Sequence, residues 1–98
     1  MASNFKINRS RQWDDLHLRL TGDFDGTSAF ELFYAIKEGV SLFNSIYIHT
    51  DSLSSMLPFG RDAFVTNYAL AGLSADKLRF TGKFAVYLTP HPSEEIAV

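Results

Sequence analysis

Three histidines are the side chains with the widest chemical range in this sequence: His17, His49 and His91. An imidazole can bind a metal or move a proton near neutral pH. No two of the three stand four residues apart, the spacing that places two metal ligands on one helix face. His17 alternates with leucines and is interpreted as the outward residue of a strand. His49 ends another predicted strand, at the edge where α/β sheets bind ligands, and is the better functional candidate.

Two carboxylates, Asp23 and Asp25, stand in the pattern Asp-x-Asp-Gly, which is similar to part of a calcium loop. A calcium loop also needs a bidentate glutamate at its twelfth position, and counting from Asp23 that position is Tyr34. We therefore predict no metal site at these residues. Asp25 is instead expected to accept hydrogen bonds from backbone amides just before a helix.

A third group of reactive side chains is formed by the hydroxyls of Ser52, Ser54 and Ser55. A phosphate on one of them would be stabilised by the amides and the positive end of a following helix. The alternative is that these serines serve the loop itself, because their hydroxyls bond the neighbouring backbone. The three serines are therefore candidate phosphorylation sites, and the loop interpretation is favoured.

Length and composition exclude several classes of function. The chain has 98 residues, no cysteine, and 9 Lys and Arg against 11 Asp and Glu. This length predicts one domain over residues 1–98, and the residues from Pro90 onward, 90–98, are expected to form a frayed tail. The acidic balance argues against a nucleic-acid partner, and the lack of cysteine excludes a disulfide framework and a thiolate zinc site.

No apolar run approaches the ~20 residues that a membrane helix needs. Residues 1–10 also lack the apolar segment of a signal peptide. We expect a cytoplasmic protein without a membrane partner.

The elements that must position these side chains follow from hydrophobic periodicity. The pattern predicts strands at residues 5–7, 16–21, 45–49 and 77–81, with residues 8–15 as a turn and 50–59 as a loop. A first helix is expected to begin at Ser28, in a capping box with Glu31, and to end at Gly39. A second helix is expected to begin at Pro58 and end at Gly72. Residues 83–88 fit a short helix or a strand, and the helix is favoured.

Strands that alternate with single helices predict parallel crossovers. The expected fold is an α/β sheet of about four strands, with the first strand antiparallel and the rest parallel. Two main helices and a short third helix complete this small domain.

Two segments carry a resemblance to a known family. Residues 19–32 read RLTGDFDGTSAFEL, and residues 46–60 read IYIHTDSLSSMLPFG. The first resembles the signature of STAS domains, the anti-sigma factor antagonist family, in which Gly22, Phe24 and Asp25 match a glycine, an apolar residue and an aspartate. The second resembles the third strand and switch loop of the same family. The order and spacing of the predicted elements agree with this resemblance over roughly residues 5–90.

The switch loop departs from the family pattern at the residue that matters most. In the family this loop reads Asp-Ser-Ser/Thr-Gly, and a partner kinase phosphorylates the serine directly after the aspartate. With Gly60 as the anchor, the aspartate falls on Leu57, the phosphorylated serine on Pro58 and its neighbour on Phe59. Because proline has no hydroxyl, position 58 cannot carry a phosphate.

The resemblance implies a non-catalytic protein-interaction module, a bacterial-type regulator of transcription without the usual phosphorylatable serine. Its implied partner is an anti-sigma factor or kinase of the histidine-kinase-like ATPase type. The expected partner-binding residues are Asp25, Gly26, Thr27, Ser28, Leu53, Ser54, Ser55, Pro58, Phe59, Gly60 and Arg61.

Phe59 is interpreted as either a core residue or a binding anchor. One alternative function is a small-ligand or nucleotide-binding module that uses the same loops and helix starts as an anion site. An enzyme ranks last, because the sequence offers no nucleophile–base pair. We predict no cofactor and no metal.

Overall fold

The computed structural model describes residues 4–72 and 75–89. Along the chain it forms β1 (Lys6–Gln12), β2 (Asp15–Phe24), α1 (Gly26–Gly39), β3 (Ser45–His49), β4 (Leu53–Met56), α2 (Pro58–Ala71), β5 (Leu78–Thr81) and α3 (Ala85–Leu88). The frayed tail expected at 90–98, which includes His91, lies outside the described residues. No helix within the described ranges is long and apolar enough to cross a membrane.

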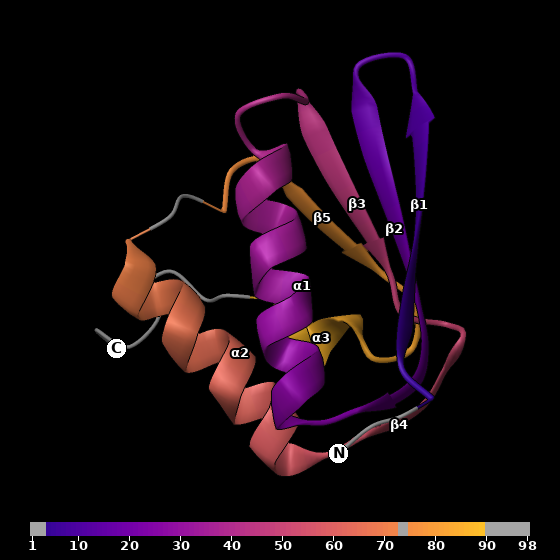
Figure 1. Ribbon diagram of the computed structural model, residues 1–98, viewed down its shortest axis with the longest axis vertical. Coiled ribbons are helices and arrows are strands. Elements are labelled where there is room, and N and C mark those ends of the chain that lie inside the picture. The colour runs from indigo at the N-terminus through magenta and orange to yellow at the C-terminus, as the bar shows by residue number, and fades with distance from the viewer. Residues whose placement is uncertain (1–3, 73–74, 90–98) are drawn as a thin grey trace.

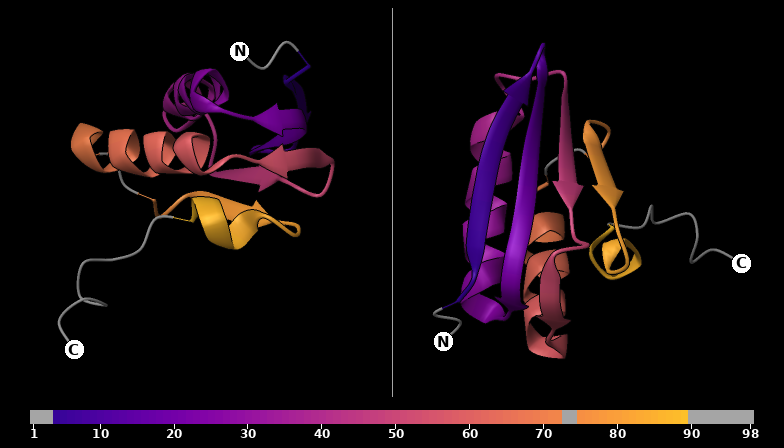
Figure 2. Two further views of the ribbon diagram at one scale, coloured as in Figure 1. Left: turned by 90° about the horizontal axis from the view of Figure 1, so that it is seen from below. Right: turned by 90° about the vertical axis from the view of Figure 1, so that its right-hand side faces the viewer.

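The sheet has the strand order β1-β2-β3-β5, with β4 paired to the far end of β2. β1 is antiparallel to β2, and the β2–β3, β2–β4 and β3–β5 pairs are parallel. This arrangement confirms the predicted α/β fold with an antiparallel first strand. Helices α1 and α2 lie on one side of the sheet (Figure 1), and the strands stand in front of both helices in the right-hand view of Figure 2.

Alternation along β2 decides which side chains enter the core. Leu16, Leu18 and Leu20 are buried, whereas the side chains between them are half-buried or exposed. Burying a leucine stabilises a fold by about 1.5–3 kcal/mol, so β2 is held firmly with this face toward the helices. The apolar face of α1 covers it, with Leu32 and Ile36 completely buried.

The first hairpin is longer than the sequence pattern predicts. Gln12 pairs with Asp15, so the turn consists of Trp13 and Asp14 alone, and Trp13 has a left-handed φ of 57°. The prediction of a turn over residues 8–15 was wrong for Asp15, which begins β2, and for residues 8–12. Their side chains are exposed and polar, and the backbone pairing with β2 makes them a strand.

A second correction concerns the start of α1. The helix begins at Gly26, and its cap is Asp25, whose carboxylate accepts from the Ser28 backbone N–H at 3.0 Å. The predicted capping box of Ser28 and Glu31 was therefore wrong, and the expectation for Asp25 was right. Gly39 is the last helical residue and Val40 is the C-cap. Gly39 serves packing, since a Cβ there would lie 2.9 Å from a Leu16 methyl.

Residues 53–56 form the short strand β4, not the predicted loop. Its pairing with Gly22, Asp23 and Phe24 at the end of β2 supplies backbone hydrogen bonds that its own sequence does not predict. The sheet therefore has five strands rather than about four.

The remaining elements follow the sequence prediction. Helix α2 begins at Pro58 and ends before Gly72, which adopts the left-handed conformation typical of a helix C-cap. Strand β5 lies within the predicted segment 77–81, and the favoured helix at 83–88 is confirmed by α3. α3 packs against α2 and β5 and buries Leu88.

The cap of α1 gives the first testable expectation. Asp25→Ala removes the acceptor of the Ser28 N–H and should lower the free energy of unfolding by about 1 kcal/mol in urea denaturation. The hydrogen bond from the Ser28 backbone also lowers the pKa of Asp25. A lowered pKa means that this stabilisation is present above the ordinary pKa of about 3.9 and is lost as the pH falls through the folded-state value.

Glu31→Ala is the matched control for this cap. Its side chain is exposed and makes no hydrogen bond to another described residue, so its loss should change stability by less than about 0.5 kcal/mol. If Glu31→Ala lowered the free energy of unfolding as much as Asp25→Ala, the predicted capping box of Ser28 and Glu31 would be supported instead.

Candidate functional site

The starts of α1 and α2 meet at the carboxyl end of β2. The Leu57 backbone N–H donates to the Phe24 carbonyl at 3.0 Å, while Asp25, the next residue after β2, caps α1. Gly60 permits this contact, because a Cβ there would lie 2.6 Å from the Phe24 carbonyl oxygen and 2.8 Å from the Asp25 Cα. Backbone atoms cannot move aside as a flexible side chain can. The two helix starts are therefore fixed next to each other.

A shallow hollow of about 490 Å³ lies between these two helix starts. We call it the helix-start surface; it is lined by Asp25, Gly26, Thr27, Phe30, Leu57 and Phe59. Three of its side chains are large, apolar and exposed: Phe59 at 75%, Phe30 at 48% and Leu57 at 42%. The Phe59 ring lies over Gly26, where an added Cβ would be 2.7 Å from a ring carbon.

The exposure of Phe59 answers the question that the sequence leaves open. Its relative exposure of 75% excludes a place in the core. Exposed apolar residues scattered singly are normal on a protein surface, whereas contiguous groups of them are typical of interaction sites. Phe59 forms such a group with Phe30 and Leu57.

The predicted partner-binding residues other than Ser54 and Ser55 fall into three groups. Asp25, Gly26, Thr27 and Phe59 line the helix-start surface. Pro58 and Arg61 line a neighbouring hollow of about 180 Å³ together with Met56, Phe84 and Tyr87. Ser28, Leu53 and Gly60 are buried, so these residues support the surface from below and do not form it.

The candidate phosphorylation sites differ in their surroundings. The Ser55 hydroxyl is half-buried and donates to the Asp23 carboxylate at 2.6 Å. Ser52 and Ser54 are exposed, and neither makes a side-chain hydrogen bond to another described residue. The expected bonds from these hydroxyls to neighbouring backbone are not seen among the described residues. Ser54 and Ser55 lie in a strand, and the Ser55 hydroxyl instead helps to hold β4 on β2.

The charged groups around the helix-start surface are few. Asp25 keeps its negative charge to low pH, because hydrogen bonds from Ser28 lower its pKa. The Arg61 guanidinium is bonded to the Asp62 carboxylate at 3.0 Å, which leaves that pair locally neutral. Within residues 4–72 and 75–89, no group of three or more metal-binding side chains comes together.

Sequence reasoning missed two residues of this surface. Phe30 lies in the first helix next to the buried Ala29, and a large aromatic beside the apolar face of a helix was the available signal. Leu57 was noted only as the residue that replaces an aspartate in the family loop. His49 lies elsewhere, on the sheet face away from α1 and α2, with His17 within hydrogen-bond distance.

Comparisons with known proteins identify the fold. No family model matches the chain, and no curated protein sequence matches it. A solved structure described as "Crystal Structure Analysis of Mglu" is similar with a TM-score of 0.59 and 14% identity, over 78% of this chain and 19% of the other. This chain therefore spans about a fifth of that protein.

A second solved structure is similar to this chain over nearly its whole length. It is an uncharacterised protein of the DUF3478 family from Shewanella loihica PV-4, with a SpoIIAA-like fold. The similarity has a TM-score of 0.55 and 13% identity, over 99% of this chain and 78% of the other. Identities this low establish the fold alone. The chain thus has a SpoIIAA-like, STAS-like fold, in agreement with the resemblance of its sequence.

Proposed function

We propose that this protein is a non-catalytic STAS-like interaction module, an anti-sigma factor antagonist-like regulator that binds another protein through its helix-start surface. The observation that carries the proposal is the group of exposed apolar side chains Phe30, Leu57 and Phe59 around one hollow. The proposed partner is an anti-sigma factor or kinase of the ATPase type. The proposal places both proteins in the cytoplasm.

The geometry of the helix-start surface suits protein recognition. Phe59 protrudes from the first turn of α2, and aromatic anchors of this kind contribute most of the binding energy in many interfaces. The surface is rigid, because the Asp25 cap and the Gly60 contact fix both helix starts. A preformed surface loses little conformational entropy on binding, which favours affinity.

Control of binding by phosphorylation is not part of the proposal. The residue at the family's phosphorylation position is Pro58, the first residue of α2. Ser55 has the right chemistry, but its hydroxyl is bonded to Asp23 and its backbone is paired in β4. Binding is therefore proposed to be constitutive or to be controlled at another site.

A kinase assay tests this part of the proposal. After incubation with an anti-sigma factor kinase and ATP, intact mass should show no stoichiometric phosphate on Ser52, Ser54 or Ser55. The physical reason is alignment, since a shift of the attacking hydroxyl by about 1 Å can cost ~100-fold in rate. Pro58→Ser is the positive control, because it restores a hydroxyl at the family position. Full phosphorylation of Ser54 or Ser55 in the unchanged protein would contradict constitutive binding.

A further inference from the structure

The outward face of the sheet carries a cluster of titratable side chains that the proposed function does not use. The β2–β3 register pairs His17 with Tyr47 and Arg19 with His49, so all four side chains stand on this face. Leu18 and Ile48, between them, point the other way and are buried. The right-hand view of Figure 2 looks on to this side of the strands. We call it the outer face.

Two of these side chains are joined directly. His17 Nδ1 and His49 Nε2 are 2.9 Å apart, and the two ring planes differ by only 8°. The ring centroids are 5.1 Å apart, which is the nitrogen separation plus about half a ring width on each side. This sum is reached only when both nitrogens lie on the line that joins the two centroids. The rings therefore lie nearly in one plane and point nitrogen to nitrogen, the alignment of an N–H···N hydrogen bond.

This bond limits the charge of the pair. One proton lies between the two facing nitrogens, and the other nitrogen of His49 is 2.7 Å from the Thr81 hydroxyl. One additional proton can enter at an outer nitrogen without disturbing the central bond, which gives a pair with a single positive charge. A second additional proton would put an N–H group on each of the two facing nitrogens, 2.9 Å apart, and would break the hydrogen bond between them. The intact pair is thus either neutral or singly charged.

The surroundings of His49 disfavour its charged form. Burial lowers the pKa of His49, and the charges of His17 and Arg19 lower it further, while Asp51 opposes them. The exposed Arg19 guanidinium has no hydrogen-bond partner among the described residues. The other charged and titratable groups on this face are Lys6 on β1, Asp15, Arg19 and Asp23 on β2, Tyr47 on β3, Asp51 after β3 and Arg79 on β5.

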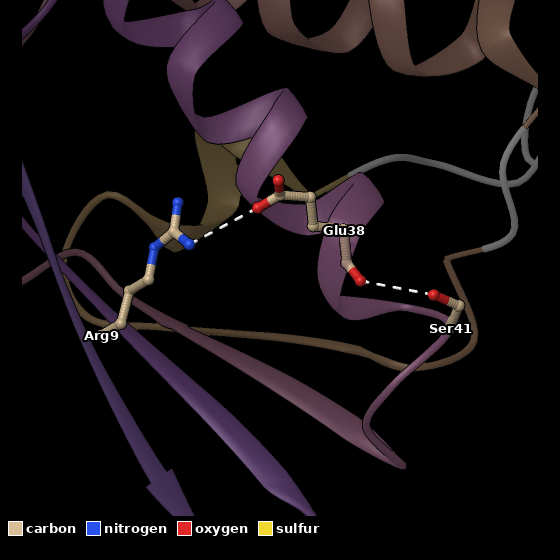
Figure 3. A network of polar contacts seen from close by, with 3 residues as sticks. All are labelled: Arg9, Glu38 and Ser41. Carbon is tan, nitrogen blue, oxygen red and sulfur yellow. Dashed lines mark hydrogen bonds and ion pairs between the residues drawn. The ribbon is translucent and has the colours of Figure 1, made fainter.

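Other arginines near this face already have partners. The Arg9 guanidinium reaches over α1, 3.5 Å from the Glu38 carboxylate, whose residue also accepts from the Ser41 hydroxyl through its backbone carbonyl (Figure 3). The Arg79 guanidinium donates to the carbonyls of Asp76 and Leu78. Among the arginines described on the outer face, Arg19 is therefore the one with all of its donors available to a ligand.

The outer face has a hollow of about 310 Å³ beside Arg19. It is lined by His17, Arg19, His49 and the β1 residues Asn8, Arg9, Ser10 and Gln12. The side chains of Asn8, Ser10 and Gln12 are exposed and make no hydrogen bond to another described residue. The hollow thus combines an available guanidinium, two amides, a hydroxyl and a histidine pair that can take up one charge. Charge-assisted hydrogen bonds of this kind suit a tetrahedral oxyanion.

We propose that this hollow on the outer face binds a tetrahedral oxyanion, as a free ion or as the phosphate group of a small molecule, and that binding takes up a proton on the His17–His49 pair. An anion beside the pair stabilises its charged form. By linkage, protonation must then strengthen anion binding by the same factor. This site is separate from the helix-start surface, so a negative result for one proposal does not affect the other.

Sulfate is the suitable probe, because its charge does not change near neutral pH and any pH dependence belongs to the protein. Titration of the full chain with sodium sulfate, followed by ¹H–¹⁵N spectra of the histidine rings, should shift the signals of His17 and His49. Affinity should be about tenfold higher near pH 6 than near pH 8.5, within the usual range of coupling between sites. Calorimetry in two buffers of different ionisation enthalpy should show proton uptake.

Three variants locate the site. Arg19→Gln should weaken sulfate binding about tenfold. His17→Gln combined with His49→Gln, which removes both imidazoles that can take up the proton, should abolish the pH dependence. Arg79→Gln is the matched control on the same face and should change affinity by less than about twofold, because its guanidinium is already bonded to carbonyls. All four substituted positions are at least partly exposed, so the fold is expected to persist.

The result that would overturn the proposal is sulfate affinity that is equal in Arg19→Gln, Arg79→Gln and the unchanged protein, or equal at both pH values. A second titration with glycerol phosphate distinguishes the two sources of the oxyanion. Tighter binding than that of sulfate supports a phosphorylated small molecule, and equal binding supports a free ion.

Discussion

Replacing Leu32 with alanine is expected to lower the free energy of unfolding by about 2–5 kcal/mol. Leu32 is completely buried in α1, on the face that covers the sheet. Truncation removes its transfer free energy and leaves a cavity that a close-packed core fills only in part. For a domain of this size the loss corresponds to a fall of roughly 10–30 °C in Tm. Thermal and urea unfolding followed by circular dichroism measure both quantities.

Tyr34→Ala is the control on the same helix. Its side chain is larger than that of Leu32, but it is 58% exposed on the opposite side of α1. Its loss should cost less than about 0.5 kcal/mol, as for most surface positions. Equal costs for Leu32→Ala and Tyr34→Ala would contradict the packing of α1 on the sheet.

The second large effect is expected on binding. Phe59→Ala should weaken the complex with the protein partner by about 2 kcal/mol, as the loss of an aromatic anchor does. This corresponds to a roughly 30-fold rise in Kd, measurable by isothermal titration calorimetry. Because Phe59 is 75% exposed, the Tm of the free protein should change little.

Val86→Ala is the control for this binding prediction. Val86 is another exposed apolar residue, at 66%, and it lies on α3, outside the helix-start surface. The partner should bind this variant as it binds the unchanged protein. A large fall in Tm for Phe59→Ala would assign the ring to the core, and equal Kd values for both variants would move the interface elsewhere.

The fold could be predicted where local pattern and tertiary structure agree. Leucines alternating along β2 and the Pro58 and Gly72 boundaries of α2 carry their own signals, and the structure has the same elements. The strand β4 has no such signal. Its residues 53–56 read LSSM, and the strand exists because the end of β2 offers unpaired backbone groups. That pairing joins segments far apart in the sequence.

The start of α1 shows a different limit of sequence reasoning. Asp25 and Ser28 are both good cap residues, and the side chain of each could accept a hydrogen bond from the backbone N–H three residues further on. The structure selects Asp25, since its backbone is extended while Ser28 is already helical and buried. Local spacing alone cannot choose between two caps that lie three residues apart.

The candidate sites depend on which segments the fold brings together. Asp25 and Phe59 were both expected among the partner-binding residues, and both line the same hollow. The contact between His17 and His49 depends on the β2–β3 register, which places Arg19 opposite His49. A shift of two residues would separate the imidazoles and leave the alternating pattern unchanged.

A photoreactive benzoylphenylalanine in place of Phe59, introduced into the full chain in its own cells, tests the helix-start surface and needs no purified partner. The same group in place of Val86 is the matched control. Irradiation should give a covalent adduct with one discrete protein from position 59 and none from position 86, and mass spectrometry should identify that protein as an anti-sigma factor or kinase of the ATPase type. An adduct with one protein from position 86 alone, or no adduct from position 59, would contradict docking at this surface.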